Sequence, residues 1–164
     1  MRRRDKEVLD PAIALDVLAR GEVLRLAMIA AGAPYVVPLS YAAVPGPPGS
    51  PLAGLRLYVH SAPEGKKVAA LRADPRVSFE VTVDVAVVRA SRACDFGLRF
   101  RSVVGEGRAR FLDDAPGKAR ALSLIASRYG AAGPIGEADA ARVLVVEIAV
   151  DAVSCKVSPP PRAA

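Results

Sequence analysis

The sequence of 164 residues contains no tryptophan, a single histidine and only two cysteines. Aromatic residues account for 5% of the chain, which disfavours a surface on which nucleic-acid bases stack. Cys94 and Cys155 do not have the spacing of metal ligands, so we expect two buried free thiols and no metal site. The sequence also lacks a Gly-x-Ser-x-Gly motif, and no cysteine adjoins the histidine, which disfavours nucleophilic hydrolysis.

Long apolar runs are absent as well. The runs at 85–88 and 143–146 are far shorter than the ~20 residues that a helix needs to cross a bilayer. The N-terminal sequence MRRRDKEVLDP is charged and is not followed by the apolar stretch of a secretion signal. These features predict a cytoplasmic protein with no membrane partner.

The residues that are present indicate one folded domain. Apolar residues make up 52% of the chain, and its length is sufficient for one ordinary core. We therefore expect a single domain over residues 1–157. The proline-rich end SPPPRAA predicts a disordered tail over residues 158–164.

The formal net charge is +6, which is compatible with nucleic acid, a membrane surface or a small anionic ligand. Basic residues are spread along the chain, apart from the runs at 2–4 and 66–67. A nucleic-acid-binding module stays an alternative, and its binding should fall steeply with salt. The scarcity of aromatic residues disfavours it, so no nucleic-acid partner is expected.

The pattern of apolar residues predicts about six strands and three helices. Strands are expected where apolar and polar residues alternate, at 23–30, 34–41, 55–60, 76–90, 101–112 and 141–157. Helices are expected at 11–20, after Asp10 and Pro11, in the stretch 63–74, and from Asp114 to Tyr129. Pro38 belongs at a strand edge or break. Short connections without regular alternation of strands and helices indicate an antiparallel sheet or barrel.

The sequence LYVHSAPEGKK is the best candidate for a binding site. His60 ends an apolar strand, a small polar turn follows, and Lys66 and Lys67 open a helix. Backbone donors and the helix dipole favour an anion at such a point, and Ser61 adds a hydroxyl. The pattern thus predicts a phosphate site, although a solvated lysine pair remains the alternative. His60 is a candidate proton donor near neutral pH.

Several blocks occur in an order and spacing that are specific together, namely RLAM, PYVVPLSY, LYVHSAPEGKK, DPRVSFEV and ACDFGLRFRSVVGEGRARFL. With them the chain resembles the pyridoxamine 5′-phosphate oxidase-related flavoproteins from its start to about Tyr129. Among these it most resembles the nitroimidazole-resistance branch. The resemblance implies a six-stranded antiparallel Greek-key split barrel with flanking helices. It also implies a homodimer that binds flavin mononucleotide (FMN) at the subunit interface.

The resemblance also assigns residues. It implies that Lys66 and Lys67 hold the flavin phosphate and that His60 and Ser61 lie between phosphate and ring. Ser102 occupies a position where relatives often have a glutamine that contacts the flavin. The segment implied along the flavin ring comprises Val37, Pro38, Leu39, Ser40 and Tyr41.

The function implied is that of an FMN-dependent oxidoreductase. Reduced flavin would pass electrons to a small planar acceptor, such as a nitroaromatic compound, with His60 as the catalytic residue. The alternative is a flavin- or heme-binding protein of the same fold without catalysis, in which His60 is the one histidine available as a heme ligand. The chain lacks the C-terminal arginine and histidine segment with which the vitamin B6-forming oxidases bind substrate, so that activity is not predicted.

Overall fold

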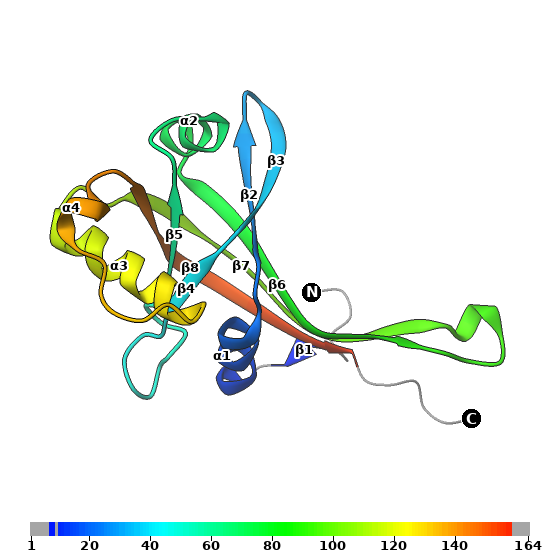
Figure 1. The fold of residues 1–164 in the computed structure, drawn as a ribbon. Helices are drawn as coiled ribbons and strands as arrows, with labels where there is room; N and C mark the ends of the chain where they lie inside the picture. The colour runs from blue at the N-terminus through cyan, green and yellow to red at the C-terminus, as the bar shows by residue number, and fades with distance from the viewer. Residues whose placement is uncertain (1–6, 9, 159–164) are drawn as a thin grey trace.

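The computed structural model describes residues 7–8 and 10–158, and Figure 1 shows their arrangement. The strands are β1 (Glu7–Val8), β2 (Leu24–Ala30), β3 (Ala33–Leu39), β4 (Tyr41–Val44), β5 (Arg56–Ser61), β6 (Arg76–Val88), β7 (Gly97–Phe111) and β8 (Leu144–Ser158). The helices are α1 (Pro11–Arg20), α2 (Lys66–Ala73), α3 (Ala115–Arg128) and α4 (Glu137–Ala140), with a 3-10 turn η2 (Ala93–Asp95). The predicted mainly β, antiparallel fold with peripheral helices is therefore confirmed.

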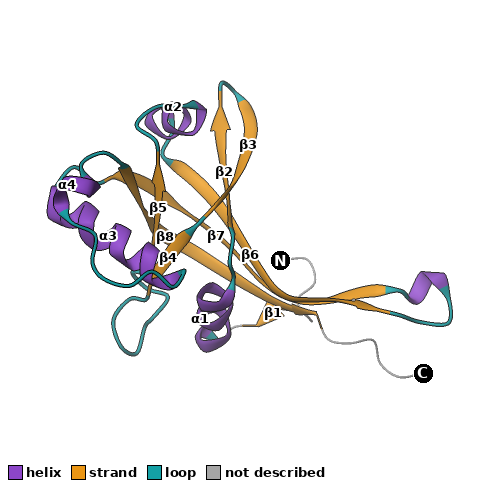
Figure 2. Ribbon diagram, viewed as in Figure 1, coloured by secondary structure: helices purple, strands orange, loops and turns teal. Residues whose placement is uncertain are grey.

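The strands form one antiparallel sheet in the order β3-β2-β6-β7-β8-β5-β4, with β1 beside β8. The two outer members of this order, β3 and β4, are consecutive in the chain and are separated only by Ser40. The two edges of the sheet therefore meet at Ser40, and the sheet must curl into a barrel. Figure 2 shows the helices at the periphery of this sheet.

All six predicted strands exist, but the count of six is too low. The predicted strand 34–41 is divided into β3 and β4 at Ser40, two residues after Pro38, because the chain leaves its partner β2 there and joins β5. The two-residue strand β1 was not predicted. Strand β7 starts at Gly97, four residues earlier than expected, because the segment 97–100 continues the hairpin with β6 and pairs with Val88 through Ala86.

The side chains that fill the barrel follow the alternation of apolar and polar residues from which the strands were predicted. In β2, Leu24, Leu26 and Met28 point inward and are buried, as are the equivalent positions of β6. Helix α1 closes one end of the barrel with Val17 and Leu18, which are fully buried. Burying each such aliphatic side chain contributes about 1.5–3 kcal/mol to folding.

Helix ends follow the predicted capping residues. Asp10 accepts a hydrogen bond from the Ala12 amide at 2.9 Å, and Asp114 accepts one from the Gly117 amide at 2.6 Å. Such caps satisfy amides that have no partner within the helix, and each contributes about 1 kcal/mol. Helix α4 was missed because its four residues, EADA, are too short to show an apolar period.

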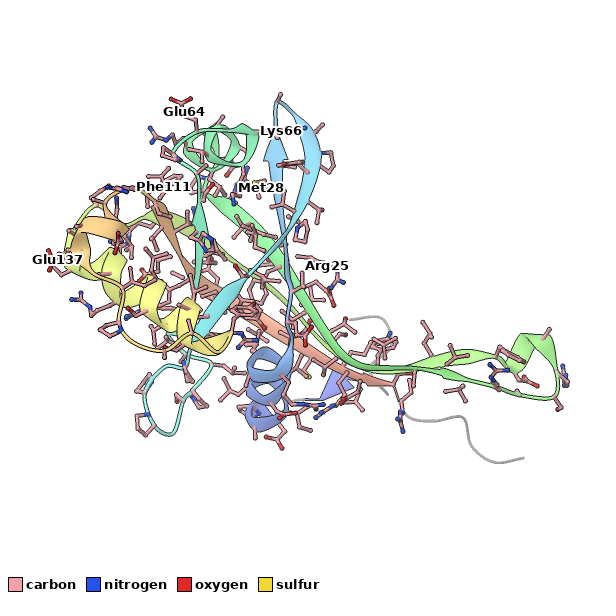
Figure 3. The ribbon with its side chains drawn as sticks, viewed as in Figure 1. Arg25, Met28, Glu64, Lys66, Phe111 and Glu137 are labelled. Carbon is pink, nitrogen blue, oxygen red and sulfur yellow. The ribbon has the colours of Figure 1, made fainter. Side chains whose placement is uncertain are left out.

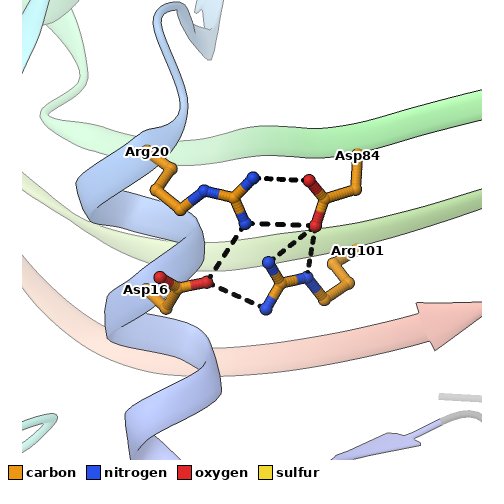
Figure 4. Close-up of polar contacts among 4 residues, drawn as sticks. All are labelled: Asp16, Arg20, Asp84 and Arg101. Carbon is orange, nitrogen blue, oxygen red and sulfur yellow. Dashed lines mark hydrogen bonds and ion pairs between the residues drawn. The ribbon is translucent and has the colours of Figure 1, made fainter.

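Beyond the barrel, β6 and β7 continue as a two-stranded hairpin, residues 85–100, which we call the arm (Figure 1). A register shift between Val83 and Ala86 marks its base, where Asp84 adopts a positive φ of 57°. Asp84 pairs with Arg20 of α1 at 2.5 Å and with Arg101 at 2.6 Å. Figure 4 shows both ion pairs. Arg101 also pairs with Asp16 at 2.8 Å, so helix α1 is tied to the base of the arm.

The prediction of two buried thiols is half wrong. Cys155 is buried in β8, whereas Cys94 is exposed in the 3-10 turn of the arm. Strand β8 continues through Ser158, and the rest of the predicted tail lies outside the described residues. Within the described part of the chain, no helix combines the length and the apolar character that a membrane span requires.

Candidate functional site

The predicted phosphate turn lies between the end of β5 and the start of α2. Strand β5 pairs with β8, so that His60 lies opposite Val145 and Ser61 opposite Leu144. Gly65 precedes the helix with φ 131°, a conformation open to glycine but strained for other residues. No side chain caps the first amides of α2. These amides remain available as donors to an anion at the positive end of the helix dipole.

The two lysines point to different sides of this turn. The Lys67 ammonium donates a hydrogen bond to the His60 carbonyl at 3.2 Å, and partial burial lowers the pKa of Lys67. The Lys66 ammonium lies 4.4 Å from the centroid of the Tyr35 ring in β3. Figure 3 shows Lys66 between α2 and the β2–β3 hairpin. The turn therefore has a cation on each side, one toward β5 and one toward β3.

His60 has an exposed side chain at the same strand end. Its pKa is lowered from the usual 6.5, first by partial burial and then by the positive charge of Lys67. The lowered pKa favours the neutral imidazole, which can donate one N–H hydrogen bond. The role of His60 as a catalytic proton donor stays a prediction.

The predicted ring-contact segment runs along the free edge of β3. In the register with β2, Val37 lies opposite Leu26 and Pro38 opposite Arg25. Pro38 is exposed, while Val37 and Leu39 are partly buried against the core. Strand β3 is the last strand of its side of the sheet among the described residues, so Pro38 sits at an edge, as predicted. Ser40 follows, half-buried, where the two sheet edges meet.

Tyr41 is the most deeply buried residue of this segment. Its ring is completely buried, its hydroxyl donates to the Leu18 carbonyl at 2.7 Å, and burial raises its pKa to about 12. The Tyr41 amide donates to the Tyr129 hydroxyl at 3.2 Å, and that hydroxyl donates to the Glu22 carbonyl at 2.7 Å. The hydroxyl and the amide of Tyr41 are therefore both occupied within the chain, and the predicted contact of Tyr41 with the flavin stays a prediction that only its backbone carbonyl could make.

Arg128 and Tyr129, at the end of α3, were missed by the sequence analysis. The Arg128 guanidinium lies 4.2 Å from the centroid of the Tyr41 ring and donates to the Gly21 carbonyl. Together with the Tyr129 hydroxyl, it holds the start of β4 against the end of α1. These two residues therefore fix the position of the Ser40 junction, although no local pattern in the sequence indicates it.

Ser102 lies far from the turn within one chain. It is buried in β7 and pairs with Lys156 of β8, whereas Ser61 pairs with Leu144 of the same strand. These two positions are twelve residues apart, a separation of up to roughly 40 Å at about 3.3 Å per residue. One chain thus brings His60, Ser61 and both lysines together but leaves Ser102 apart.

The turn is an open surface in the single chain, because residues 62–66 are all exposed. Among the cavities formed by the described residues are four with volumes between 350 and 630 Å³, and these four are lined by other parts of the chain. The cavity of about 560 Å³ approaches the turn through Tyr35 and Val36 of β3. The described residues hold no cluster of histidine, cysteine or acidic side chains that could bind a metal ion.

Comparison with known protein families shows to which of them the chain belongs. Residues 10–157 match the family model described as pyridoxamine 5′-phosphate oxidase, and the chain therefore belongs to this family. A solved FAD-binding protein from Mesorhizobium loti is 30% identical, with a TM-score of 0.63 over 92% of this chain and 96% of that one. No functionally curated protein matches the chain significantly.

Two more distant structures share the fold. A candidate 5-nitroimidazole antibiotic resistance protein from Bacteroides thetaiotaomicron is 22% identical, with a TM-score of 0.75 over 92% of this chain and 86% of that one. A FAD- and heme-binding protein from Mycobacterium smegmatis is 20% identical, with a TM-score of 0.75 over 96% and 77% of the two chains. The family expected from the sequence blocks is confirmed.

Proposed function

We propose that the protein binds FMN at the turn between β5 and α2 and works as an oxidoreductase that reduces a small planar acceptor. The observation that carries this proposal is the uncapped start of α2 with a lysine ammonium on each side. Amides at a helix start and two cations are what a phosphate monoester requires. Similarity to a protein named as FAD-binding supports a flavin.

When bound, the flavin supplies electron transfer, and the chain supplies position and charge. The free edge of residues 37–40 offers backbone groups to the polar rim of the ring. The neutral imidazole of His60 offers an N–H to the acceptor or to the flavin chain. Partly exposed at the strand end, it orients a bound group without adding a charge.

The proposed cofactor site lies between two copies of the chain, in a homodimer. Two observations support this arrangement: the turn is open in the single chain, and Ser102 is remote from it along β8. A second copy could cover the turn and bring its own Ser102 toward it. We also propose that the protein functions in the cytoplasm.

The experiment that tests the proposal is the absorption spectrum of the purified protein, followed by identification of the released cofactor by mass spectrometry. We expect flavin bands and FMN, bleaching with a nicotinamide donor, and recovery on adding a nitroaromatic acceptor. Flavin that is reduced but never reoxidised by any such acceptor would support a binding protein instead. A colourless protein that takes up neither FMN nor FAD would refute the proposal.

The double variant Lys66→Ala/Lys67→Ala tests the phosphate site directly. Each lost charge-assisted contact costs about 1.5–3 kcal/mol, so FMN affinity should fall by roughly two to four orders of magnitude. Isothermal titration calorimetry measures the affinity of the variant for FMN. The control Arg56→Ala/Arg108→Ala removes the same charge from exposed positions in β5 and β7, outside the turn and the α3–α4 groove, and should keep the affinity. Equal affinities in both variants would place the phosphate elsewhere.

Heme is the second candidate ligand, because His60 is an exposed histidine and a structural relative is named as heme-binding. In that case the spectrum would show a Soret band. His60→Ala should abolish this band, since the sequence has no second histidine to replace the ligand.

A further inference from the structure

The arm carries an apolar face that nothing in the described chain covers. Val85 and Val87 are 61% and 63% exposed, and Phe96 and Leu98 are each 51% exposed. Val87 pairs with Leu98, so these two side chains share one face of the hairpin. Val85, in the register shift at the base, and Phe96, just before β7, add exposed apolar surface at the two ends of the arm. Isolated two-stranded hairpins are marginally stable in water, and exposed apolar patches mark interaction sites.

The arm is nevertheless held in a fixed direction. At its base, Asp84 pairs with both Arg20 and Arg101, and Arg101 reaches Asp16 of α1 (Figure 4). A hairpin fixed at its base loses less entropy when it binds a partner, because its orientation is set in advance. The ion network thus sets the direction of the arm before the arm binds a partner, which favours docking.

A groove of matching character lies between α3 and the segment that leads to α4. It has a volume of about 630 Å³, and its lining includes the apolar residues Ala119, Leu124, Pro134 and Ile135. Leu124 is 44% exposed. The groove also contains Arg120 and Glu137, so its charged groups balance within the lining itself.

Charge complementarity between the two surfaces comes from the neighbouring helix. Helix α4 carries Asp139 in addition to Glu137, so one negative charge remains beside the groove after Glu137 is balanced by Arg120. The arm carries three arginines and one acidic residue, in the sequence VAVVRASRACDFGLRF. A basic, apolar hairpin therefore suits an apolar groove with an acidic helix at its side.

We propose that the arm of one copy docks by its apolar face into the α3–α4 groove of a second copy, and that the second copy does the same in return. The arm and α3–α4 lie at opposite ends of the molecule (Figure 1), so the arm cannot reach the groove of its own chain. Two copies lying antiparallel bring both ends together about one two-fold axis. This inference rests on the homodimer of the proposed function and names the surfaces that form it.

The first test measures mass in solution by light scattering after gel filtration. The wild type should have twice the chain mass of 17.1 kDa, and Phe96→Ser/Leu98→Ser should have the mass of one chain. The control Val23→Ser changes an exposed apolar side chain, 39% exposed, that belongs neither to the arm, nor to the α3–α4 groove, nor to the proposed flavin site, and it should stay dimeric. A monomeric wild type, or a dimer lost only in the control, would overturn the proposal.

The second test uses the exposed thiol of Cys94 in the arm. Ser127→Cys adds a thiol to the groove lining, and a short bismaleimide should then join two chains. Wild type and the control Ser50→Cys, in the β4–β5 loop, should give no such product, because the two arm tips lie at opposite ends of the dimer. Cross-linked dimers in wild type, or none with Ser127→Cys, would refute the docking. Flavin plays no part in either test, so a protein that binds flavin can still fail them.

Discussion

His60 and the lysines beside it form a site in which the histidine is kept neutral. The pKa of His60 is lowered by partial burial and by Lys67, whose ammonium contacts the carbonyl of the same histidine. A bound phosphate would offset the lysine charge and raise the pKa of His60 again. Cofactor binding and the protonation of His60 are therefore expected to be linked.

Replacing His60 separates binding from turnover. In His60→Ala the lysines and the α2 amides remain, so FMN should stay bound, while loss of one hydrogen bond of about 1–1.5 kcal/mol should slow acceptor reduction roughly tenfold. His60→Gln keeps an N–H donor and should recover part of the rate. Stopped-flow reoxidation of the flavin measures both variants. If His60→Ala reacts as fast as wild type with every acceptor tried, His60 has no part in the reaction.

The substitution Tyr129→Phe should weaken the contacts that hold the chain at Ser40, where β3 is followed by β4. The variant removes the hydroxyl that accepts from the Tyr41 amide and donates to the Glu22 carbonyl. Tyr129 is 46% exposed, so water replaces part of the loss, and we expect about 1 kcal/mol lower unfolding free energy. Urea denaturation measures this, and hydrogen exchange at the Tyr41 amide should accelerate.

Tyr35→Phe is the matched control, since no hydrogen bond of the Tyr35 hydroxyl is formed within the described chain. It should leave the unfolding free energy nearly unchanged. A Tyr129→Phe variant with wild-type stability and slow exchange at Tyr41 would show that Arg128 alone holds the junction.

The predicted site could be located from the sequence only where its parts are adjacent in the chain. His60, Ser61 and both lysines are within eight residues, so the strand–turn–helix pattern brought them together. The burial of Tyr41 could be expected from strand alternation, which puts it on the inward side with Val37 and Leu39, whereas the family resemblance marks the whole segment 37–41 without distinguishing its two faces. The contact with Tyr129 joins positions 88 residues apart, for which a single sequence gives no signal.

Among the elements, the ion network at the base of the arm has a definite pH dependence. Hydrogen bonds from Arg20 and then from Arg101 lower the pKa of Asp84 from 3.8 to about 2. A carboxylate whose pKa is depressed by folding stabilises the fold above its unfolded pKa. This contribution is lost as the pH falls from about 4 through 2.

Asp84→Asn should therefore melt at a lower temperature than wild type at pH 7, and the difference should shrink as the pH is lowered from 4 to 2. Circular dichroism at several pH values measures both proteins. Asp95→Asn, which removes a local pair with Arg92 at the arm tip, is the control and should have little effect. A difference that persists unchanged at pH 2 would mean that the positive φ of residue 84, rather than its charge, sets the stability.

The elements themselves were largely predictable, because their signals are local. Asp10 with Pro11 and Asp114 mark helix starts, and alternation marks the long strands. The arm was predicted only in part. Its first strand, 85–88, falls within the predicted strand 76–90, whereas 97–100 was not predicted as a strand, because the tip SRACDFG has neither alternation nor a strong turn signal.

At the scale of the whole molecule, the sheet order could not be deduced from the strand pattern. Strands β3 and β4 are neighbours in the chain but belong to opposite edges of the sheet, and only the break after Pro38 hints at it. The closure depends on contacts of β4 with β5 and of Tyr41 with α1, which join distant segments. The family resemblance supplied this topology where the residues alone did not.

The net charge of +6 makes a prediction about how the whole molecule meets its cofactor. A cationic protein attracts the FMN phosphate over several ångströms, and salt screens this attraction. Association of FMN with the cofactor-free protein should slow by about tenfold between low and high ionic strength. Riboflavin has the same ring without the phosphate, and its association should be nearly independent of salt. Stopped-flow quenching of flavin fluorescence measures both rates, and equal salt dependence of FMN and riboflavin would contradict a site built around the phosphate.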